Sequence, residues 1–303
     1  MITTVPSDDA VEALTDALAA VTVGDRALAA GRAGEAAQAG SDLGRLMAAA
    51  LSTPAGTTGV YDAPGAFRAF IGAGGNRALY RATSSALAAT YRRWEPNDLL
   101  EVGPGDGHAL LSALRAAAPT VPSSITLAEP SQALYEECRD RLSDQGFAVD
   151  AGAGPQSIQT VLRAHPNRRW DLAESTFALH ALPPQQRTSV LRQLSERTRR
   201  IILAEFDVRL PPPETREHLR QLAVRYERGL AEYDDERDLV GAGFLVPVLL
   251  GQLEPDAVRS TWEQSADDWA VQVTAAGFYD VSVQPLADYW WSAAFVLTAA
   301  GRR

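Results

Sequence analysis

The sequence predicts an α/β fold in which helices cover both faces of a mostly parallel sheet. From about residue 97 onward, short apolar runs alternate with amphipathic segments, as in strands joined by helical crossovers. The first apolar run leads directly into a glycine-rich turn, as where a buried strand passes into a helix. The chain has 303 residues, more than one such domain needs, so helical additions are also expected.

The pattern predicts seven strands, in each of which a short apolar run is followed by turn residues. They are expected at residues 99–102, 125–128, 147–149, 171–175, 200–206, 279–284 and 293–298. The segments between them have the apolar spacing of helices, which are expected at residues 109–118, 132–142, 157–164, 184–197 and 265–276.

Two further regions have helical patterns outside this alternation. Residues 1–95 are predicted to form an N-terminal helical cap, which would also suit a homodimer interface, and its last helix, over residues 76–94, should end before Pro96. Residues 96–303 then form the main domain. Residues 209–260, after the fifth strand, are too long for a simple crossover and are expected to form a helical lid insertion.

Composition narrows the partners and the compartment. A net charge of −10 would repel phosphate backbones and anionic lipids, so neither nucleic acid nor a membrane is expected as a partner. The longest apolar run, residues 239–250, is shorter than the roughly 20 residues of a bilayer span. The single cysteine, Cys138, excludes an internal disulfide and suits a reducing, cytoplasmic location.

The most informative motif follows the first predicted strand. Residues 101–107 read Glu-Val-Gly-Pro-Gly-Asp-Gly, so that Gly103, Gly105 and Gly107 follow a G-x-G-x-G spacing instead of the dinucleotide spacing G-x-G-x-x-G. Glycines leave backbone open to a ligand, and the next helix offers free N–H groups to an anion. Glu129, before Pro130, ends the next predicted strand, where its carboxylate can accept both ribose hydroxyls.

Together these features resemble the class I, Rossmann-like S-adenosylmethionine-dependent methyltransferases of the small-molecule type, over residues 98–298. The resemblance implies that the three glycines line the methionine part of S-adenosyl-L-methionine, that Glu101 supports its ammonium group, and that Glu129 and Pro130 hold its ribose. The family often places an acidic residue for adenine after the third strand. Residues 152–157 instead read Gly-Ala-Gly-Pro-Gln-Ser, so Gln156 or Ser157 would take that place.

Candidate catalytic groups follow the fourth and fifth predicted strands. Ligands of open parallel sheets bind at the carboxyl ends of the strands, so Glu174, Ser175 and His180 should lie near the methyl donor. Glu205 ends the fifth strand and can orient His180 as a base that removes a proton from the acceptor. A similar His and Glu pair occurs in carbon-methylating domains of polyketide synthases. His180 alternatively caps its loop or contacts the cofactor only.

No metal is expected, because the four histidines lack the spacing of common metal sites. Only a folded cluster of His180, Glu205 and Asp207 would change that view. Aromatic residues outside the sheet are candidates for an apolar acceptor pocket, and Tyr226, Tyr233 and Trp290 are predicted to line it.

The sequence therefore predicts an S-adenosylmethionine-dependent methyltransferase that acts on a small molecule, in secondary metabolism, by C- or O-methylation. Two alternatives stay open. One is an NAD(P)-dependent oxidoreductase. The other is a methyltransferase-like binding protein without turnover.

Overall fold

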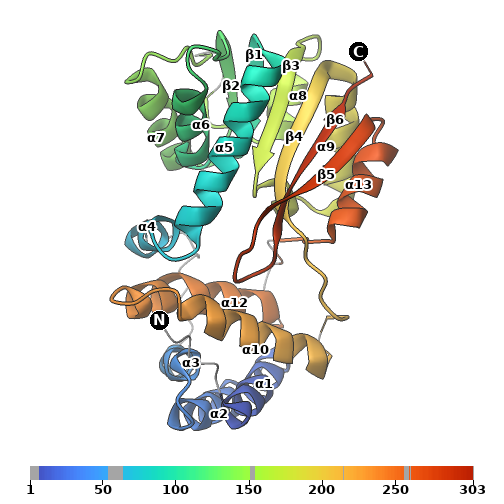
Figure 1. Ribbon diagram of the computed structural model, residues 1–303. Helices are drawn as coiled ribbons and strands as arrows, with labels where there is room; N and C mark the ends of the chain where they lie inside the picture. Colours follow the sequence, from blue (N-terminus) through green and yellow to red (C-terminus); the bar gives the residue numbers. More distant parts are fainter. Residues whose placement is uncertain are drawn as a thin grey trace. The chain divides into compact units, whose positions relative to one another are not determined.

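The computed structural model describes residues 7–53, 64–150, 154–213, 215–255, 259 and 261–302, and the chain divides into two compact units (Figure 1). Unit 1 consists of Met1–Arg77, Arg209–Ser260 and Tyr289–Trp291. Unit 2 consists of Ala78–Val208, Thr261–Asp288 and Ser292–Arg303. The chain passes between the units within one helix, at Arg77, whereas the sequence pattern suggested a domain boundary near residue 95.

Unit 2 is built on a six-stranded sheet with the order β2-β1-β3-β4-β6-β5. Strands β1 to β4 are parallel to one another, and β6 is antiparallel to both β4 and β5. The strands are β1 (Asp98–Val102), β2 (Ser124–Ala128), β3 (Trp170–Thr176), β4 (Thr198–Phe206), β5 (Tyr279–Ala287) and β6 (Ala294–Ala300). The mostly parallel α/β architecture predicted from the sequence is confirmed.

The prediction of a seventh strand at residues 147–149 is wrong. This segment makes only one isolated parallel bridge, from Val149 to Ile125. Phe147 and Val149 are partly buried against the core beside β2, which accounts for their apolar character without a strand. Two apolar positions are enough to pack a short segment on a sheet edge but too few to sustain a ladder.

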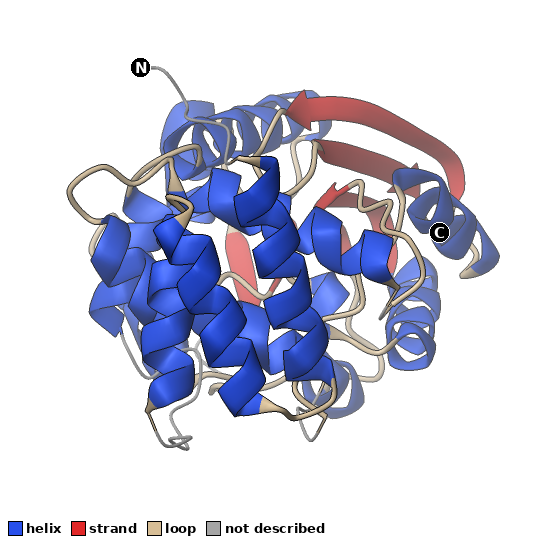
Figure 2. Ribbon diagram, turned by 90° about the horizontal axis from the view of Figure 1, so that it is seen from below, coloured by secondary structure: helices blue, strands red, loops and turns tan. Residues whose placement is uncertain are grey.

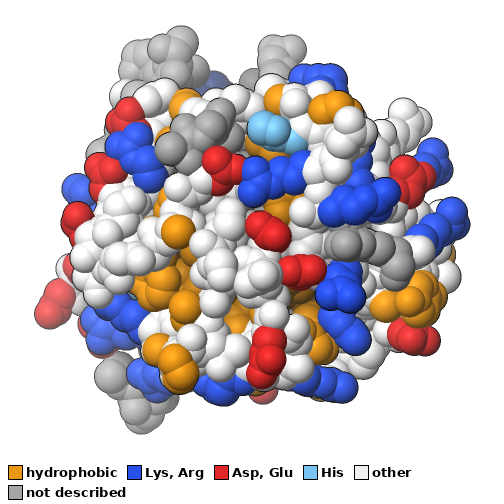
Figure 3. Space-filling model, turned by 90° about the horizontal axis from the view of Figure 1, so that it is seen from above, with side chains coloured by type: hydrophobic (Ala, Val, Ile, Leu, Met, Phe, Trp, Pro, Cys, Tyr) orange, Lys and Arg blue, Asp and Glu red, His pale blue; other side chains and the backbone are white. Residues whose placement is uncertain are grey.

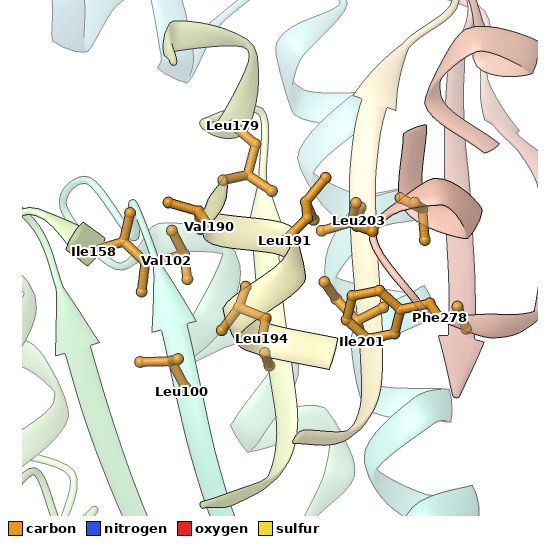
Figure 4. Close-up of a cluster of buried hydrophobic side chains, with 14 of the residues drawn as sticks. Leu100, Val102, Ile158, Leu179, Val190, Leu191, Leu194, Ile201, Leu203 and Phe278 are labelled. Atoms are coloured by element: carbon orange, nitrogen blue, oxygen red, sulfur yellow. The ribbon is translucent and has the colours of Figure 1, made fainter. Parts of the chain in front are cut away.

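Six helices cover the two faces of the sheet. One face packs against α5 (Asn76–Trp94), α6 (His108–Ala117) and α7 (Gln132–Ser143), and the other packs against α8 (Ile158–Ala164), α9 (Pro184–Arg197) and α13 (Ala266–Ala275). Figure 4 shows the second core, where Leu100, Ile201 and Leu203 from the strands meet side chains of α9. The short helix η1 (Leu179–Ala181) follows β3.

Alternation along the strands decides which residues face which core. Leu99, Leu172 and Ile202 belong to the core beneath α5, α6 and α7, whereas Leu100, Ala173 and Leu203 belong to the core beneath α8, α9 and α13. Because successive side chains of a strand point to opposite faces, the same alternation decides to which face each polar residue near a strand end points.

Unit 1 is helical (Figure 2). Its helices are α1 (Asp8–Thr22), α2 (Arg26–Gln38), α3 (Asp42–Ser52), α4 (Pro64–Gly72), α10 (Arg216–Leu230), α11 (Arg237–Val240), η2 (Gly241–Leu245) and α12 (Val246–Leu253). The side chains of Ser7, Asp25 and Ser41 accept hydrogen bonds from the first turns of α1, α2 and α3, as N-caps do. Within the described residues, no helix combines the length and apolar composition that crossing a bilayer requires.

The N-terminal helices and the insertion after β4 pack into this one unit. Buried Glu227 of α10 accepts hydrogen bonds from the hydroxyl of Ser41 and from the backbone N–H groups of Asp42 and Leu43. A carboxylate at a helix N-terminus satisfies donors that lack partners within the helix. Glu227 therefore ties α10 to the start of α3.

Candidate active site

The loop between β1 and α6 depends on glycine conformation. Gly103, Gly105 and Gly107 have φ angles of 70°, 57° and 77°, in the left-handed region that other residues resist. Gly107 is the N-cap of α6, which begins at His108. The strand, glycine loop and helix predicted from the sequence are all present.

The three glycines have different surroundings. A Cβ atom on Gly103 would lie 2.4 Å from the Cβ of Ala178, and one on Gly107 would lie 2.7 Å from the Sγ of Cys138. A Cβ atom on Gly105 would meet no described atom within 4 Å. Gly103 and Gly107 thus allow close packing within the protein, and only Gly105 borders open space that a ligand can occupy.

Glu129 contacts the glycine loop from the end of β2. Its carboxylate accepts hydrogen bonds from the backbone N–H of Gly105, at 3.2 Å, and of Ser131, at 2.9 Å. Burial raises the pKa of Glu129, and these two bonds act against that rise. Neighbouring Pro130 is exposed. The residues expected to hold a ribose and a methionine moiety are therefore in direct contact.

Glu101 and Glu174 are paired residues on adjacent strands β1 and β3. Only 1% of Glu101 and 0% of Glu174 is exposed. The buried phenol of Tyr91, on α5, donates a hydrogen bond to the Oε1 of Glu174 at 2.5 Å. The sequence predicted Glu174 near the methyl donor, but it did not identify Tyr91, which lies in a helix that the sequence assigned to the N-terminal cap.

Burial is the main cause of the raised pKa values in this cluster. Burial raises the pKa of Glu101 well above its usual value, and the nearby charge of Glu174 raises it further. Burial also raises the pKa of Glu174, against the opposing effect of its hydrogen bonds. Burial also raises the pKa of Tyr91, so its phenol stays protonated.

His180 and Glu205 form the pair that the sequence predicted. The Nδ1 of His180 lies 2.8 Å from the Oε2 of Glu205, and the backbone N–H of His180 donates to the Oε1 at 3.2 Å. A carboxylate can only accept, so this contact favours the tautomer with Nδ1–H and leaves Nε2 free to take a proton. The side chain of His180 is 16% exposed, and that of Glu205 is 1% exposed.

The balance of burial and charge sets the protonation of His180. Burial lowers the pKa of the imidazole, but the charge and the hydrogen bond of Glu205 raise it, and the net result is a raised pKa. The imidazole can therefore accept a proton and hold it as a cation beside the carboxylate.

Phe177, just before η1, is held in a strained conformation that the sequence did not predict. Its φ angle is 52°, which is uncommon for a residue with a bulky side chain. Its ring stacks on that of Phe206, with centroids 4.6 Å apart, and its N–H donates to the carbonyl of Ala204. These contacts with β4 fix the turn that carries His180.

Arg187 on α9 stabilises, through Trp262, the turn that carries His180. Its fully buried guanidinium donates to the carbonyl of Trp262 at 2.8 Å and to the Oε1 of Gln264 at 2.7 Å. The N–H of Trp262 in turn donates to the carbonyl of His180 at 2.7 Å. Arg187 thus holds the segment that is bonded to η1.

The remaining predicted residues are placed as follows. The hydroxyl of Ser175 donates to the carbonyl of Val102 and so links β3 to β1. The Oε1 of Gln156 is buried and has no hydrogen-bond partner among the described residues. Gly152 and Ala153, in the segment considered for adenine contacts, lie outside the described residues.

The aromatic candidates Tyr226, Tyr233 and Trp290 all belong to unit 1 and are buried there. The hydroxyl of Tyr226 accepts a hydrogen bond from Gln252, and that of Tyr233 accepts one from Asn76. The rings of Tyr226 and Trp290 pack edge to face, with centroids 5.6 Å apart. These side chains form part of the core of unit 1, and their role toward an acceptor stays a prediction.

The part of the chain that the structure describes contains no group of three or more His, Cys, Asp or Glu side chains that could hold a metal ion. On the face that Figure 3 shows, acidic and basic side chains are interspersed.

Comparison with known proteins identifies the fold. No known family model and no curated protein sequence matches the chain. The crystal structure of SCL7 from Oryza sativa is similar at a TM-score of 0.65 with 17% identity, over 97% of this chain and 100% of that one. This likeness shows a shared fold, and the mixed six-stranded α/β sheet is consistent with the Rossmann-like architecture that the resemblance to class I methyltransferases implied.

Two weaker likenesses are to structures with a bound ligand. The N-terminal domain of EvdMO1, with SAH bound, has a TM-score of 0.47 and 13% identity, over 75% of this chain and 84% of that one. Magnesium protoporphyrin IX methyltransferase (ChlM) from Synechocystis PCC 6803, with bound SAM, has a TM-score of 0.44 and 12% identity, over 78% of this chain and 90% of that one.

We predict that Gly103→Ala strongly destabilises unit 2. The new Cβ would clash with Ala178, and the positive φ adds strain, so we expect a loss of about 3 kcal/mol of unfolding free energy. The double variant Gly103→Ala with Ala178→Gly should recover the part due to the clash. Gly105→Ala, with similar φ but no close neighbour, is the matched control and should lose only about 1 kcal/mol. Equal stability of the two single variants in urea unfolding would contradict this account.

Glu174→Gln should stabilise the protein more at alkaline than at acidic pH. The folded-state pKa values of Glu101 and Glu174 are raised, so folding favours their protonated forms, and this contribution is lost as pH rises through the folded values. Removing one acid should therefore raise Tm at pH 8 by about 2–4 °C and raise it less at pH 5. Thermal unfolding at both pH values measures the difference, and a larger gain at pH 5 would be the opposite result.

Proposed function

We propose that this protein is an S-adenosyl-L-methionine-dependent methyltransferase that methylates a small-molecule acceptor. The observation that carries the proposal is the hydrogen bond between Glu129 and the N–H of Gly105, which joins an acid at the end of β2 to the one glycine of the loop after β1 that borders open space. An acid for ribose hydroxyls and bare backbone for the methionine moiety are thereby brought to one place. The G-x-G-x-G spacing of the three glycines favours S-adenosyl-L-methionine over a dinucleotide.

The residues present fit such a cofactor. Each oxygen of Glu129 that accepts a backbone N–H retains a further lone pair for a ribose hydroxyl. Glu101, which lies on β1 two residues before Gly103, supplies negative charge for an ammonium group. When bound, S-adenosyl-L-methionine supplies an electrophilic methyl group on a sulfonium.

His180 is proposed to remove a proton from the acceptor. Its Nδ1 faces Glu205, which leaves Nε2 as the atom that takes the proton. Buried Glu205 then stabilises the imidazolium and keeps the ring in one orientation. A base of this kind serves an acceptor whose nucleophilic carbon or oxygen carries an acidic proton, which supports C- or O-methylation over methylation of a free amine or thiolate.

The acceptor is proposed to be a small organic molecule, as in secondary metabolism, and Tyr226, Tyr233 and Trp290 are proposed to contribute to its recognition. The support is chemical. Aromatic side chains offer large apolar faces to a small ligand, and these three belong to a unit outside the Rossmann-like sheet. The net charge of −10 also argues against a nucleic acid as acceptor.

Titration calorimetry tests the cofactor directly. We expect S-adenosylhomocysteine to bind and NADH or NADPH to give no heat. Gly105→Ala should weaken S-adenosylhomocysteine binding at least about tenfold, a cost of about 1.4 kcal/mol, because its methyl group occupies the open space beside the loop. Circular dichroism should show that the variant is folded. Binding of a nicotinamide nucleotide alone would instead support an oxidoreductase.

Turnover tests the His180 and Glu205 pair. With labelled S-adenosylmethionine and a panel of metabolites, His180→Ala should lower kcat by about 100-fold or more, and His165→Ala, a histidine outside the pair, should leave it unchanged. Activity needs neutral His180, so kcat should rise with pH to a midpoint above about 6.5. Glu205→Gln removes the attraction that raises the pKa of His180 and should move the midpoint to lower pH. An unchanged midpoint would argue against the pair.

A further inference from the structure

A buried cluster of three acidic groups lies behind the glycine loop. It consists of Tyr91 from α5, Glu101 from β1 and Glu174 from β3, each at most 1% exposed. Glu101 and Glu174 occupy the same register position on neighbouring parallel strands. Their side chains therefore share the face of the sheet that packs against α5, α6 and α7.

The carboxyl groups of this cluster are incompletely satisfied. Tyr91 donates to the Oε1 of Glu174, but the Oε2 atoms of Glu101 and of Glu174 are buried without a hydrogen-bond partner among the described residues. A buried polar atom without a partner costs about 1–3 kcal/mol. The two residues share one register position, and a hydrogen bond between their carboxyl groups contributes to the pKa of each, so these oxygens indicate either a shared proton or a missing donor.

The titratable groups that act most strongly on the pKa values of the pair are all acids. Glu129 at the end of β2 and Cys138 on α7 both raise the pKa of Glu101, and Tyr91 on α5 is a neutral donor. No arginine or histidine within the described parts of the chain makes an ion pair with either carboxyl. Two carboxylates this close cannot both be ionised without a cation.

We propose that Glu101 and Glu174 share one proton in the free protein and exchange it for the ammonium group of the amino-acid moiety of the bound ligand. The inference rests on the proposed function, because S-adenosylmethionine and S-adenosylhomocysteine both carry such an ammonium. In the free state, two carboxyl groups and one proton carry a charge of −1. In the bound state, two carboxylates and one ammonium also carry −1, and the proton leaves to solvent.

The exchange fits the chemistry of the cluster. An ammonium offers three N–H donors, which suffices for both unpartnered oxygens. Because it replaces a proton of the same charge, the net charge of the buried site stays at −1. The same exchange makes ligand affinity depend on pH. Because the cation binds to the deprotonated pair, affinity rises as pH rises toward the pKa of the pair and then levels off.

Calorimetry in buffers with different ionisation enthalpies counts the released protons. Wild-type protein titrated with S-adenosylhomocysteine at pH 7 in phosphate and in Tris should release about one proton for each ligand bound. The probe 5′-methylthioadenosine, which lacks the amino-acid moiety, should release none. Binding of S-adenosylhomocysteine without proton release would overturn the exchange but not the proposed function. Failure of both probes to bind would overturn the proposed function itself.

Two variants separate the pair from Glu101 alone. Glu174→Gln removes the charge that raises the pKa of Glu101 further, so the pH at which proton release falls to half should be lower than in the wild type, whereas an unchanged midpoint would overturn the shared proton. Tyr91→Phe removes the donor to Glu174, which should raise the pKa of the pair, keep proton release near one and weaken binding at pH 7. The matched control is Glu232→Gln in unit 1, where Glu232 accepts from the N–H of Gly75. It should behave as wild type.

Discussion

The close approach of Gly103 to Ala178 is the constraint on which the candidate site depends. It brings the loop after β1 against the loop after β3, where any side chain at position 103 would collide with the facing methyl group. The loop after β1 carries the glycines and contacts Glu129, and in the loop after β3 His180 follows Ala178 by two residues. Because Gly103 has no side chain, its contact with Ala178 sets the spacing between the proposed cofactor loop and the proposed base. The left-handed backbone of Gly103 makes that contact possible.

Much of this site could be predicted, because its residues lie at the ends of strands that can be recognised one by one along the sequence. A buried strand that ends in glycines, an acid at the end of the next strand, and His180 and Glu205 after two later strands all lie where a parallel sheet collects its carboxyl ends. Helices with strong end signals were also predictable. Pro184 begins α9, and the predicted range of residues 184–197 matches that helix throughout. Local sequence carries these signals, because caps, apolar spacing and turns are local.

The parts that could not be predicted depend on contacts between distant segments. The pairing of Glu101 with Glu174 exists because β1 and β3 are neighbours, a property of strand order that neither strand shows alone. Tyr91 lies in a helix that looked like part of the N-terminal cap, and only its packing on the sheet shows that its phenol meets Glu174. The segment at residues 147–149 failed for the opposite reason, since its apolar residues pack without forming a ladder.

At the carboxyl edge of the sheet, the pair Glu101 and Glu174 lies on one face and Glu205 lies on the other. Glu101 and Glu174 share the parity of Leu99 and Leu172 and face α5, whereas Glu205 shares the parity of Leu203 and faces the side of α9. Glu205 has an imidazole beside it that can carry a proton, so this acid has a cationic partner within the chain. Among the described residues the pair on the opposite face has no cationic partner, so the negative charge there is balanced by a proton or by a cation from outside. Alternation along three strands thus makes one acid suited to supporting a base and the other two suited to receiving a charged ligand.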